Sequence, residues 1–583
     1  MTIKSGHTDK RRETRLTAIA RAVIFLVSLI LLCALVIEYG FQLDEVEKAA
    51  INAIFTFSIW FYFVLYLLIV IFRRKQIVKR SIIMTVSMAL LLIYAIISNH
   101  LTPALLVFSI VELSRGIVNF IGKKTNPALL LSTAFLVITA IGTIILLVPR
   151  STLPDVRLSV ADALFVSTSA LCVTGLSPVD ISSTFTVAGQ TVILFLIQIG
   201  ALGVMTITSA FALFFMGETS IINQFALRDV VGSDTFSSLI STLLYILGFT
   251  FAIETAGFFS IWLSIHNTLG MSVGEELFFS AFHSISAFCN AGFSTLGGNL
   301  GNPALIHGHN IFYLTISILV IFGGIGFPTM VNLANIIMNI MRRIFKSALL
   351  KSSTSVKFSH LENLNTRIVL DATLFLIIGG TIIIALLEWN GAFAEMTTSG
   401  KLVHSFFNSV SPRTAGFNSV DLTLFSPLSI IFYTLLMWIG GASQSTAGGV
   451  KVNTIMVAVA NFRSILKGRE SIVLYNREID AYSVKRASAI IFGSLATIFI
   501  FWIALIVAEP QLRPYKLFFE VVSAISTVGS TLDVTPMLGT VGKLLISLLM
   551  FIGRVGLMTV LMSLMHNGRK LSYKYPVEKV IIN

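Results

Sequence analysis

Charged side chains are scarce in this sequence of 583 residues, in which Asp, Glu, Lys and Arg together make up 12%. Soluble globular proteins carry about 25%, whereas hydrophobic residues here reach 55% and the mean hydropathy is +0.89. This composition excludes a soluble globular protein and indicates an integral membrane protein. Unbroken apolar runs of about 20 residues favour spanning helices over the alternating strands of a transmembrane barrel. Such runs include 16–37, 51–72, 187–215 and 424–439.

Cysteine is almost absent, and so are the motifs of nucleotide chemistry. Cys33, Cys172 and Cys289 lie in apolar surroundings without metal-ligand spacing, so we interpret them as packing residues. The sequence contains neither a Gly-x-x-x-x-Gly-Lys-Ser/Thr phosphate loop nor a soluble catalytic domain. We therefore expect neither an enzyme nor an ATP-driven pump, no cofactor bound by the chain, and nucleotide control only through a regulatory partner.

The formal net charge of +13 comes from basic residues gathered in the segments between apolar runs. When the spans are counted, these clusters all fall on one side of the membrane, which is the positive-inside pattern. It predicts a multi-pass protein of the cell (plasma or inner) membrane with both termini in the cytoplasm. It also favours contact with membrane lipid and argues against a nucleic-acid partner. The clusters lie at 10–15, 73–80, 123–124, 342–351, 463–469 and 569–574.

One short phrase containing a single glycine occurs four times, at 169–176, 286–293, 409–417 and 523–530. Its glycines recur every 113 to 124 residues, and such regularity is the signature of an internal repeat. Each phrase ends a half-length apolar segment that lies between two long ones. Apolar segments of about 10–14 residues are too short to cross the bilayer, and re-entrant segments of this kind line a protected cavity.

We therefore predict an all-α integral membrane protein with four pseudo-fourfold repeats of helix, pore loop and helix around one central pore. About four extra transmembrane helices precede the repeats, which gives twelve spans. The predicted parts are 1–126 for the extra helices, then 127–232, 233–362, 363–480 (with an intramembrane gating loop) and 481–583 (with a C-terminal tail).

The extra helices are expected at 16–37, 51–72, 81–98 and 103–121. The fourth carries only Arg115, which excludes a voltage sensor and favours a scaffold role. In the repeats, helices are expected at 128–149, 159–172 and 187–215; at 236–266, 276–289 and 309–341; at 366–389, 400–411 and 424–462; and at 484–508, 513–526 and 538–565.

The four phrases have the composition of a cation filter. Glycine allows tight closure of the backbone around an ion, and no ring of carboxylates is present, so selectivity would depend on carbonyl dipoles. The half-helices would also point their partly negative C-terminal ends at the cavity. The predicted filter residues are Val173, Thr174 and Gly175; Asn290, Ala291 and Gly292; Thr414, Ala415 and Gly416; and Thr527, Val528 and Gly529.

From about residue 127 onward, over roughly 450 of the 583 residues, the chain resembles the Trk/Ktr/HKT superfamily of potassium-translocating subunits, and most closely its Ktr-type membrane subunit. The resemblance implies four non-identical repeats around one pore. The family's filter glycines match Gly175, Gly292, Gly416 and Gly529. Glycine at all four positions goes with potassium preference in the superfamily, whereas serine in the first repeat marks sodium-selective plant members. The resemblance therefore implies a potassium ion at the filter.

The segment 438–451 predicts a gate, because its glycines and hydroxyl side chains should break a lipid-facing helix into a loop below the filter. A glycine-rich packing face is the alternative. The family carries an intramembrane gating loop with a closely similar pattern, and the resemblance implies the same role here. The matching gate residues are Gly440, Gly441, Ser445, Thr446, Ala447, Gly448, Gly449 and Lys451.

Two ionisable residues inside apolar segments complete the predicted site. Arg554 should face the pore, bind the gate loop and add an electrostatic barrier, and the family has an arginine at the matching position. Structural pairing with Glu520 or Glu254 is the alternative for Arg554. Glu520, in the fourth half-helix, is expected to support the filter by hydrogen bonds to its backbone.

These inferences predict a potassium-selective translocating subunit that conducts passively through a gated pore. A sodium- or proton-coupled secondary transporter working by alternating access is the alternative, although such proteins usually contain inverted repeats. The resemblance further implies a homodimer on a cytoplasmic ring of nucleotide-binding regulatory subunits. The tail 574–583 resembles the segment at the family's dimer interface, and the basic loops 342–357 and 463–486 are candidate docking surfaces.

Overall fold

The computed structural model describes residues 44–72, 127–215, 236–306, 308–350, 363–469 and 471–556, with individual positions between 23 and 41 and Val86. The expected helices 81–98 and 103–121 and the tail 574–583 lie outside these residues, apart from Val86. The chain divides into two compact units. The first comprises Met1–Thr125, Thr143–Ser159 and Thr184–Val192, and the second comprises Asn126–Gly142, Val160–Ser183 and Ile193–Asn583.

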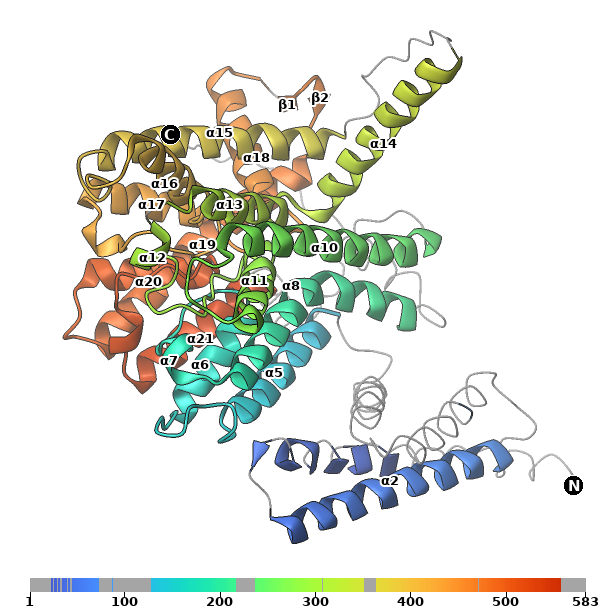
Figure 1. Cartoon of the computed structure of the whole chain (residues 1–583). Coiled ribbons are helices and arrows are strands. Elements are labelled where there is room, and N and C mark those ends of the chain that lie inside the picture. Colours follow the sequence, from blue (N-terminus) through green and yellow to red (C-terminus); the bar gives the residue numbers. More distant parts are fainter. Residues whose placement is uncertain are drawn as a thin grey trace, which may run out of the picture. The chain divides into compact units, whose positions relative to one another are not determined.

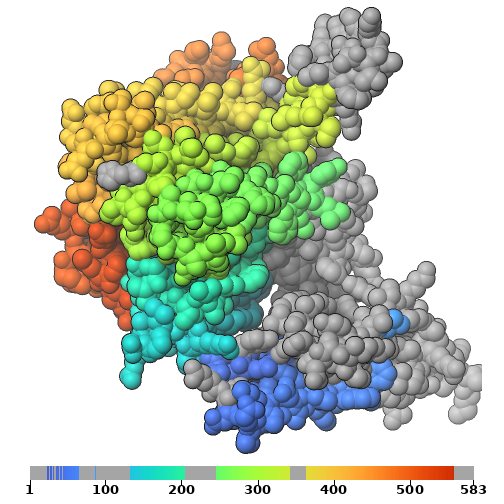
Figure 2. Space-filling view, in the orientation of Figure 1, coloured from blue at the N-terminus to red at the C-terminus, as the bar shows by residue number. Residues whose placement is uncertain are grey.

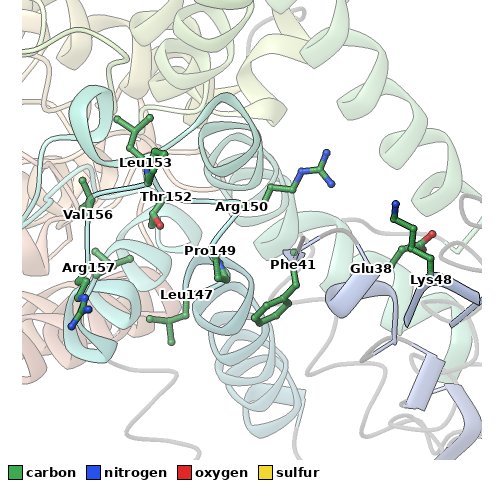
Figure 3. A pocket seen from close by; sticks show the side chains of 13 residues that line it. Glu38, Phe41, Lys48, Leu147, Pro149, Arg150, Thr152, Leu153, Val156 and Arg157 are labelled. Atoms are coloured by element: carbon green, nitrogen blue, oxygen red, sulfur yellow. The ribbon is translucent and has the colours of Figure 1, made fainter. Parts of the chain in front are cut away.

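The first unit contains α2 (Glu45–Phe72), which begins earlier than the expected 51–72. Glu45 and Glu47 lie in its first turn, where carboxylates interact favourably with the helix dipole. Within this unit, residues 147–158, the segment before α2 and the start of α2 itself line a cavity of about 1130 Å³, whose lining includes Glu38, Lys48, Arg150 and Arg157 (Figure 3).

Helices make up most of the remaining described chain (Figure 1). In order they are α5 (Pro127–Leu146), α6 (Val160–Leu171), α7 (Ile181–Thr184), α8 (Val187–Phe215), α10 (Phe236–Ile265), α11 (Val273–Phe288), α12 (Pro303–Ile306), α13 (Asn310–Ile325), α14 (Phe327–Leu350), α15 (Leu364–Glu388), α16 (Thr398–Val410), α17 (Pro427–Trp438), α18 (Val452–Leu466), α19 (Ala481–Ala508), α20 (Pro514–Ile525) and α21 (Thr540–Val555). One antiparallel hairpin, β1 (Val473–Leu474) with β2 (Arg477–Glu478), links α18 to α19.

The half-length helices predicted from the sequence are present as α6, α11, α16 and α20, and each follows a longer apolar helix. Apolar character explains the long helices, and polar caps fix where two of the half-helices, α11 and α16, start. Ser272 and Glu275 form a capping box at the start of α11, and the Thr397 side chain accepts from Gly400 N at the start of α16.

Packing within the second unit brings the half-helices onto helices distant in sequence. Helix α21 packs on α6, α13 on α16, and α17 on α20. In the space-filling view the green surface of α10–α13 is continuous with the yellow surface of α15 and α16 (Figure 2). Two large clusters of buried apolar side chains fill these contacts, one around Phe312 and Phe407, the other around Met437 and Phe519.

Three described helices are long and apolar enough to span a membrane, at Leu244–Ile265, Leu364–Glu388 and Ala481–Ala508. A fourth span forms if α13 and Phe327–Met341 are counted together, although these two helices meet at 104°. The expected continuous helix 309–341 is therefore wrong. Gly326 adopts φ 90° between the two helices, and Pro328 follows at the start of α14, where proline is tolerated but cannot continue a preceding helix.

Helix α21 ends in a related way. Helix α21 stops at Val555 and is capped by Gly556 with φ 91°, although the sequence predicted a helix over 538–565. Both breaks follow similar phrases, Gly-Gly-Ile-Gly at 323–326 and Gly-Arg-Val-Gly at 553–556. The helix expected over 424–462 is interrupted between Trp438 and Val452, as the glycine-rich segment predicted.

Candidate functional site

Each half-helix is followed by the same uncommon backbone path. The residue two before each predicted filter glycine has a positive φ, which non-glycine residues rarely adopt. These residues are Val173 (56°), Asn290 (60°), Thr414 (75°) and Thr527 (49°). The glycines follow with φ of 91° at Gly175, 70° at Gly292, 71° at Gly416 and 98° at Gly529.

The four glycines form a closed cycle, which we call the glycine ring. A methyl group added to any of them would collide with a backbone carbonyl oxygen of the next segment, namely that of the residue just before the next glycine. The resulting distances are shorter than the contacts that Cβ atoms make in real proteins. The distances would be 2.4 Å from Gly175 to Ala291 O, 2.3 Å from Gly292 to Ala415 O, 2.0 Å from Gly416 to Val528 O and 2.1 Å from Gly529 to Thr174 O. Both backbone angle and space therefore require glycine at these positions.

A serine near the end of each half-helix holds the segment that follows. The backbone amide before the ring glycine donates to the carbonyl of that serine in all four segments. The bonds run from Thr174 N to Ser169 O (2.8 Å), from Ala291 N to Ser286 O (2.7 Å), from Ala415 N to Ser411 O (2.9 Å) and from Val528 N to Ser523 O (2.9 Å). The third segment is one residue shorter between serine and glycine.

The serine hydroxyls divide the segments into two kinds. Those of Ser169 and Ser523 accept from the amides of Gly175 and Gly529, at 3.0 and 3.1 Å. Those of Ser286 and Ser411 instead donate to the carbonyls of Phe293 (2.9 Å) and Phe417 (2.5 Å). The first and fourth segments thus resemble each other in this bond, as do the second and third.

The half-helices are also fixed from behind by a repeated contact with the preceding long helix. A half-helix serine donates to a carbonyl of that helix, and a glycine three residues after the carbonyl leaves room for the serine hydroxyl. The bonds are Ser167 to Thr139 O (2.8 Å), Ser284 to Glu254 O (2.6 Å) and Ser409 to Ile377 O (2.9 Å), beside Gly142, Gly257 and Gly380. The fourth segment has Val521 at this position.

All twelve predicted filter residues are brought together in this arrangement, with the side chains beside the glycines fully or almost fully buried. The hydroxyls of Thr174 and Thr527 have no hydrogen-bond partner among the described residues, whereas the Asn290 amide group and Thr414 Oγ1 lie 3.3 Å apart. The described residues contain no group of three or more His, Cys, Asp or Glu suited to a metal. Ligands at this site would accordingly be backbone carbonyl and hydroxyl oxygens, which suit a hard cation.

The predicted gate segment is a loop between α17 and α18 that folds back on itself. Gly440 N donates to Val450 O at 3.0 Å, and Val450 N donates to Trp438 O at 3.2 Å. Gly449 adopts φ 66°, which this reversal requires. The Lys451 ammonium donates to the carbonyls of Ala447 and Gly448. The loop is thus closed by its own residues.

The same loop binds the break between α13 and α14. Ala442 N donates to Gly324 O (2.9 Å), Thr446 N to Gly323 O (3.3 Å) and Phe327 N to Gln444 O (3.1 Å). Breaking the helix at Gly326 exposes the carbonyls and the amide that make these bonds. The loop also touches the fourth ring segment, since a methyl group on Gly448 would lie 2.0 Å from Thr527 Oγ1.

Arg554 connects the loop to α8. Its guanidinium is 7% exposed and donates to the carbonyls of Thr446, in the loop, and Gly200, in α8 (2.8 Å). The pairing with Glu520 or Glu254 that the sequence left open is not present, because Glu254 accepts from Gln198 Nε2 at 3.1 Å. The backbone contact to the loop is the one that the gate hypothesis predicts for Arg554.

Glu520 differs from its expected role. Its Oε1 accepts a hydrogen bond from the hydroxyl of Thr535, in the segment after the fourth glycine, and its Oε2 has no partner among the described residues. The expected bond to the filter backbone is not present, because Ser523 one turn later satisfies that backbone instead. Glu520 therefore holds the segment that follows the fourth glycine.

Two features of the site escaped the sequence analysis. The first is the segment 323–326, which contributes to the surface that binds the loop. It was not recognised because it lies in an apparently continuous apolar run. Arg413, inside the third phrase, was treated as part of a motif. Its position immediately before Thr414, where the other phrases have Cys172, Cys289 and Ser526, was the available signal.

Comparison with known proteins places this arrangement in a class. The family model described as TrkH, a cation transport protein, matches residues 122–571. With its spanning helices, the chain is thus a multi-pass membrane protein of a cation-transport family and not of an enzyme family. More particularly, the chain belongs to the TrkH family, and the resemblance drawn from its motifs is confirmed.

Individual relatives agree with the family model. The chain is 34% identical over 467 residues to the potassium/sodium uptake protein NtpJ of Enterococcus hirae, covering 79% of this chain and 98% of that protein. It is 35% identical over 447 residues to the Ktr system potassium uptake protein B of Bacillus subtilis, covering 76% and 93%. The crystal structure of the potassium transporter TrkH from Vibrio parahaemolyticus shares the fold, with a TM-score of 0.60 at 17% identity over 79% of this chain and 91% of that one.

Proposed function

We propose that this chain is a potassium-selective translocating subunit in which ions pass through the glycine ring. The observation that carries the proposal is the closed cycle of the four glycines, each against the carbonyl oxygen of the next segment. A ring of carbonyls held at fixed spacing can replace the hydration shell of a cation. The four half-helices with their pore loops are then pseudo-fourfold repeats around one pore, with the boundaries predicted from the sequence.

The loop 439–451 is the gate of this pore. Its contact with Thr527 places it against the ring, and its bonds to Gly323 and Gly324 fasten it to a second repeat. Arg554 then holds the loop and presents a positive charge to any ion leaving the ring. Opening requires the loop to exchange these bonds for others, so conduction can be regulated without a change in the ring.

Passive conduction accounts for these features better than alternating access. All four half-helices enter the same ring, and the contacts behind three of them are equivalent, as expected for repeats of one orientation. Alternating access usually needs repeats of inverted orientation that rock around a fixed site. A sodium- or proton-coupled mechanism remains the alternative function, and sodium stands in the name of the relative NtpJ.

We propose further that the subunit works as a homodimer in the cell membrane, on a cytoplasmic ring of nucleotide-binding regulatory subunits. Support for this assembly comes from the similarity to Ktr system proteins and from the basic loops 342–357 and 463–486. Potassium is the substrate, and nucleotide acts only through the partner. Both termini lie in the cytoplasm in this assembly.

Reconstitution in liposomes tests the function. With a potassium gradient and a potassium ionophore as calibration, purified protein should carry potassium and rubidium, and replacing the gradient by sodium should reduce flux at least about tenfold. Flux that requires a simultaneous sodium or proton gradient would establish the coupled alternative. Absence of any potassium flux from protein whose gate loop has been deleted would contradict both readings.

A further inference from the structure

We infer that Arg413 weakens potassium binding at the third segment of the ring, and this inference rests on the proposed function. Arg413 lies immediately before Thr414 and three residues before Gly416. Its side chain is 7% exposed, and its Nη2 donates to Thr373 Oγ1, on α15, at 3.3 Å. A full positive charge is therefore buried on a residue three positions before a ring glycine.

Arg413 has no carboxylate partner among the described residues. Thr373 is a neutral hydroxyl, and the guanidinium Nε has no hydrogen-bond partner there. Arginine keeps its proton in proteins, so burial cannot remove the charge. Burying an unpaired charge at membrane depth is costly, and such residues mostly serve the transport path.

An uncharged residue occupies the position of Arg413 in each of the other three segments. Counted back from the ring glycine, Cys172, Cys289 and Ser526 occupy the place of Arg413. Packing alone therefore does not require a long basic side chain here, since the same backbone path forms without one. Arg413 makes the ring electrostatically asymmetric.

The positive charge of Arg413 offsets the dipole of one half-helix, α16. Helix α16 ends at Val410, and the carbonyls at its C-terminus carry the partly negative end of the helix dipole. Arg413 follows within a turn and offsets that end, whereas α6, α11 and α20 have no basic residue at the corresponding place. Three of the four half-helices then attract a cation at the ring, and the fourth does so weakly.

A ring in which one of the four segments binds potassium less tightly suits conduction. An ion that binds too tightly leaves slowly, and conduction requires binding strong enough for entry and weak enough for exit. At an effective dielectric constant of about 20, repulsion between two unit charges roughly 12–25 Å apart changes affinity by about tenfold to threefold. We therefore expect Arg413 to raise the potassium dissociation constant and to speed release.

Potassium binding to the purified full chain, followed by calorimetry with KCl in a sodium-free buffer of constant ionic strength, tests this role. Arg413→Met removes the charge and keeps much of the volume, Arg413→Lys keeps the charge, and Thr373→Val removes only the hydrogen-bond acceptor. The Met variant should bind potassium about threefold to tenfold more tightly. The Lys and Val variants should bind like the unaltered chain.

Arg513→Met is the matched control, because Arg513 is an exposed arginine at the start of α20 and its removal should not change affinity. If Arg413→Met does not fold, judged by gel filtration and thermal unfolding, Arg413→Gln takes its place with the same expectation. Unaltered affinity in a folded neutral variant would overturn the inference. A Thr373→Val variant that behaves like the neutral variants would also overturn it, because the hydrogen bond would then be the cause.

Failure of the proposed function is distinguishable from failure of this inference. If the unaltered chain shows no potassium-dependent heat and no flux, both ideas are contradicted. If it binds and conducts potassium while the neutral variants match it in affinity and in release rate, only the role of Arg413 is contradicted.

Discussion

Gly529 lies against the carbonyl oxygen of Thr174, so that the last of the four segments closes onto the first. A methyl group on Gly529 would stand 2.1 Å from that oxygen, and φ at Gly529 is 98°. Residues more than 350 positions apart thus complete one ring. This closure makes the ring a property of the whole repeated region.

The glycines behind the half-helices should be as sensitive as those in the ring. Gly380 faces the hydroxyl of Ser409, which a methyl group would approach to 2.3 Å, whereas a methyl group on the adjacent Gly379 would meet nothing within 4 Å. Gly380→Ala should therefore lower the free energy of unfolding by about 1–3 kcal/mol through overpacking, and Gly379→Ala should be neutral or stabilising. Thermal unfolding in detergent measures both.

A double variant identifies the cause. If the collision with Ser409 is responsible, adding Ser409→Gly to Gly380→Ala should restore part of the lost stability. Equal destabilisation by Gly379→Ala and Gly380→Ala would contradict the packing derived from the structure.

Removing residues 442–447 should open the pore. The deletion takes away Thr446, to which Arg554 donates, and the bonds from Ala442 and Thr446 to the broken helix. Basal potassium flux into liposomes should rise several-fold. Ser445→Ala, which removes one hydroxyl within the loop and none of the bonds to other helices, serves as the control and should leave flux near the original level. Unchanged flux in a folded deletion variant would refute the gate.

Neutralising Arg554 should have a similar effect by a different route. Arg554→Gln removes the charge at the loop and weakens the link between Thr446 and Gly200. Basal flux should rise, and because a buried charge at membrane depth costs about 2.5–3.5 kcal/mol, stability need not fall. Arg554→Lys keeps the charge and should conduct less than Arg554→Gln. Loss of folding in both variants would favour a purely structural role.

Much of the fold was predictable because membrane helices leave a strong signal. Apolar runs located α8 and α19 closely, and the short length of α6 and α16 was readable before any coordinates. Breaks inside long apolar runs were harder to predict. At 440–449 the four glycines predicted the interruption. The bend at Gly326 combines a positive φ at that residue with a hydrogen bond from Phe327 N to Gln444 O, and this contact between distant segments was not predictable from the sequence.

The candidate site was predictable in its residues and less so in its bonds. The repeated phrase predicted all four glycines. It did not predict that each glycine lies against a carbonyl oxygen of the next segment. Glu520 was assigned to the filter backbone because a buried carboxylate there needs donors, and its actual donor Thr535 lies fifteen residues away in a segment without a motif. Partner choice among distant polar groups depends on packing, which the sequence alone did not determine.

The central claim is that the glycine ring selects the ion, and Gly175→Ser tests it most directly. Serine at Gly175 would place its Cβ 2.4 Å from Ala291 O and force a side chain into a φ of 91°, so the ring must widen or distort. The measurement is the ratio of potassium to sodium flux in liposomes, with gate-loop deletion in both proteins so that gating does not limit flux. We predict that the ratio falls at least about tenfold, through increased sodium flux. An unchanged ratio in a folded Gly175→Ser protein would contradict the account.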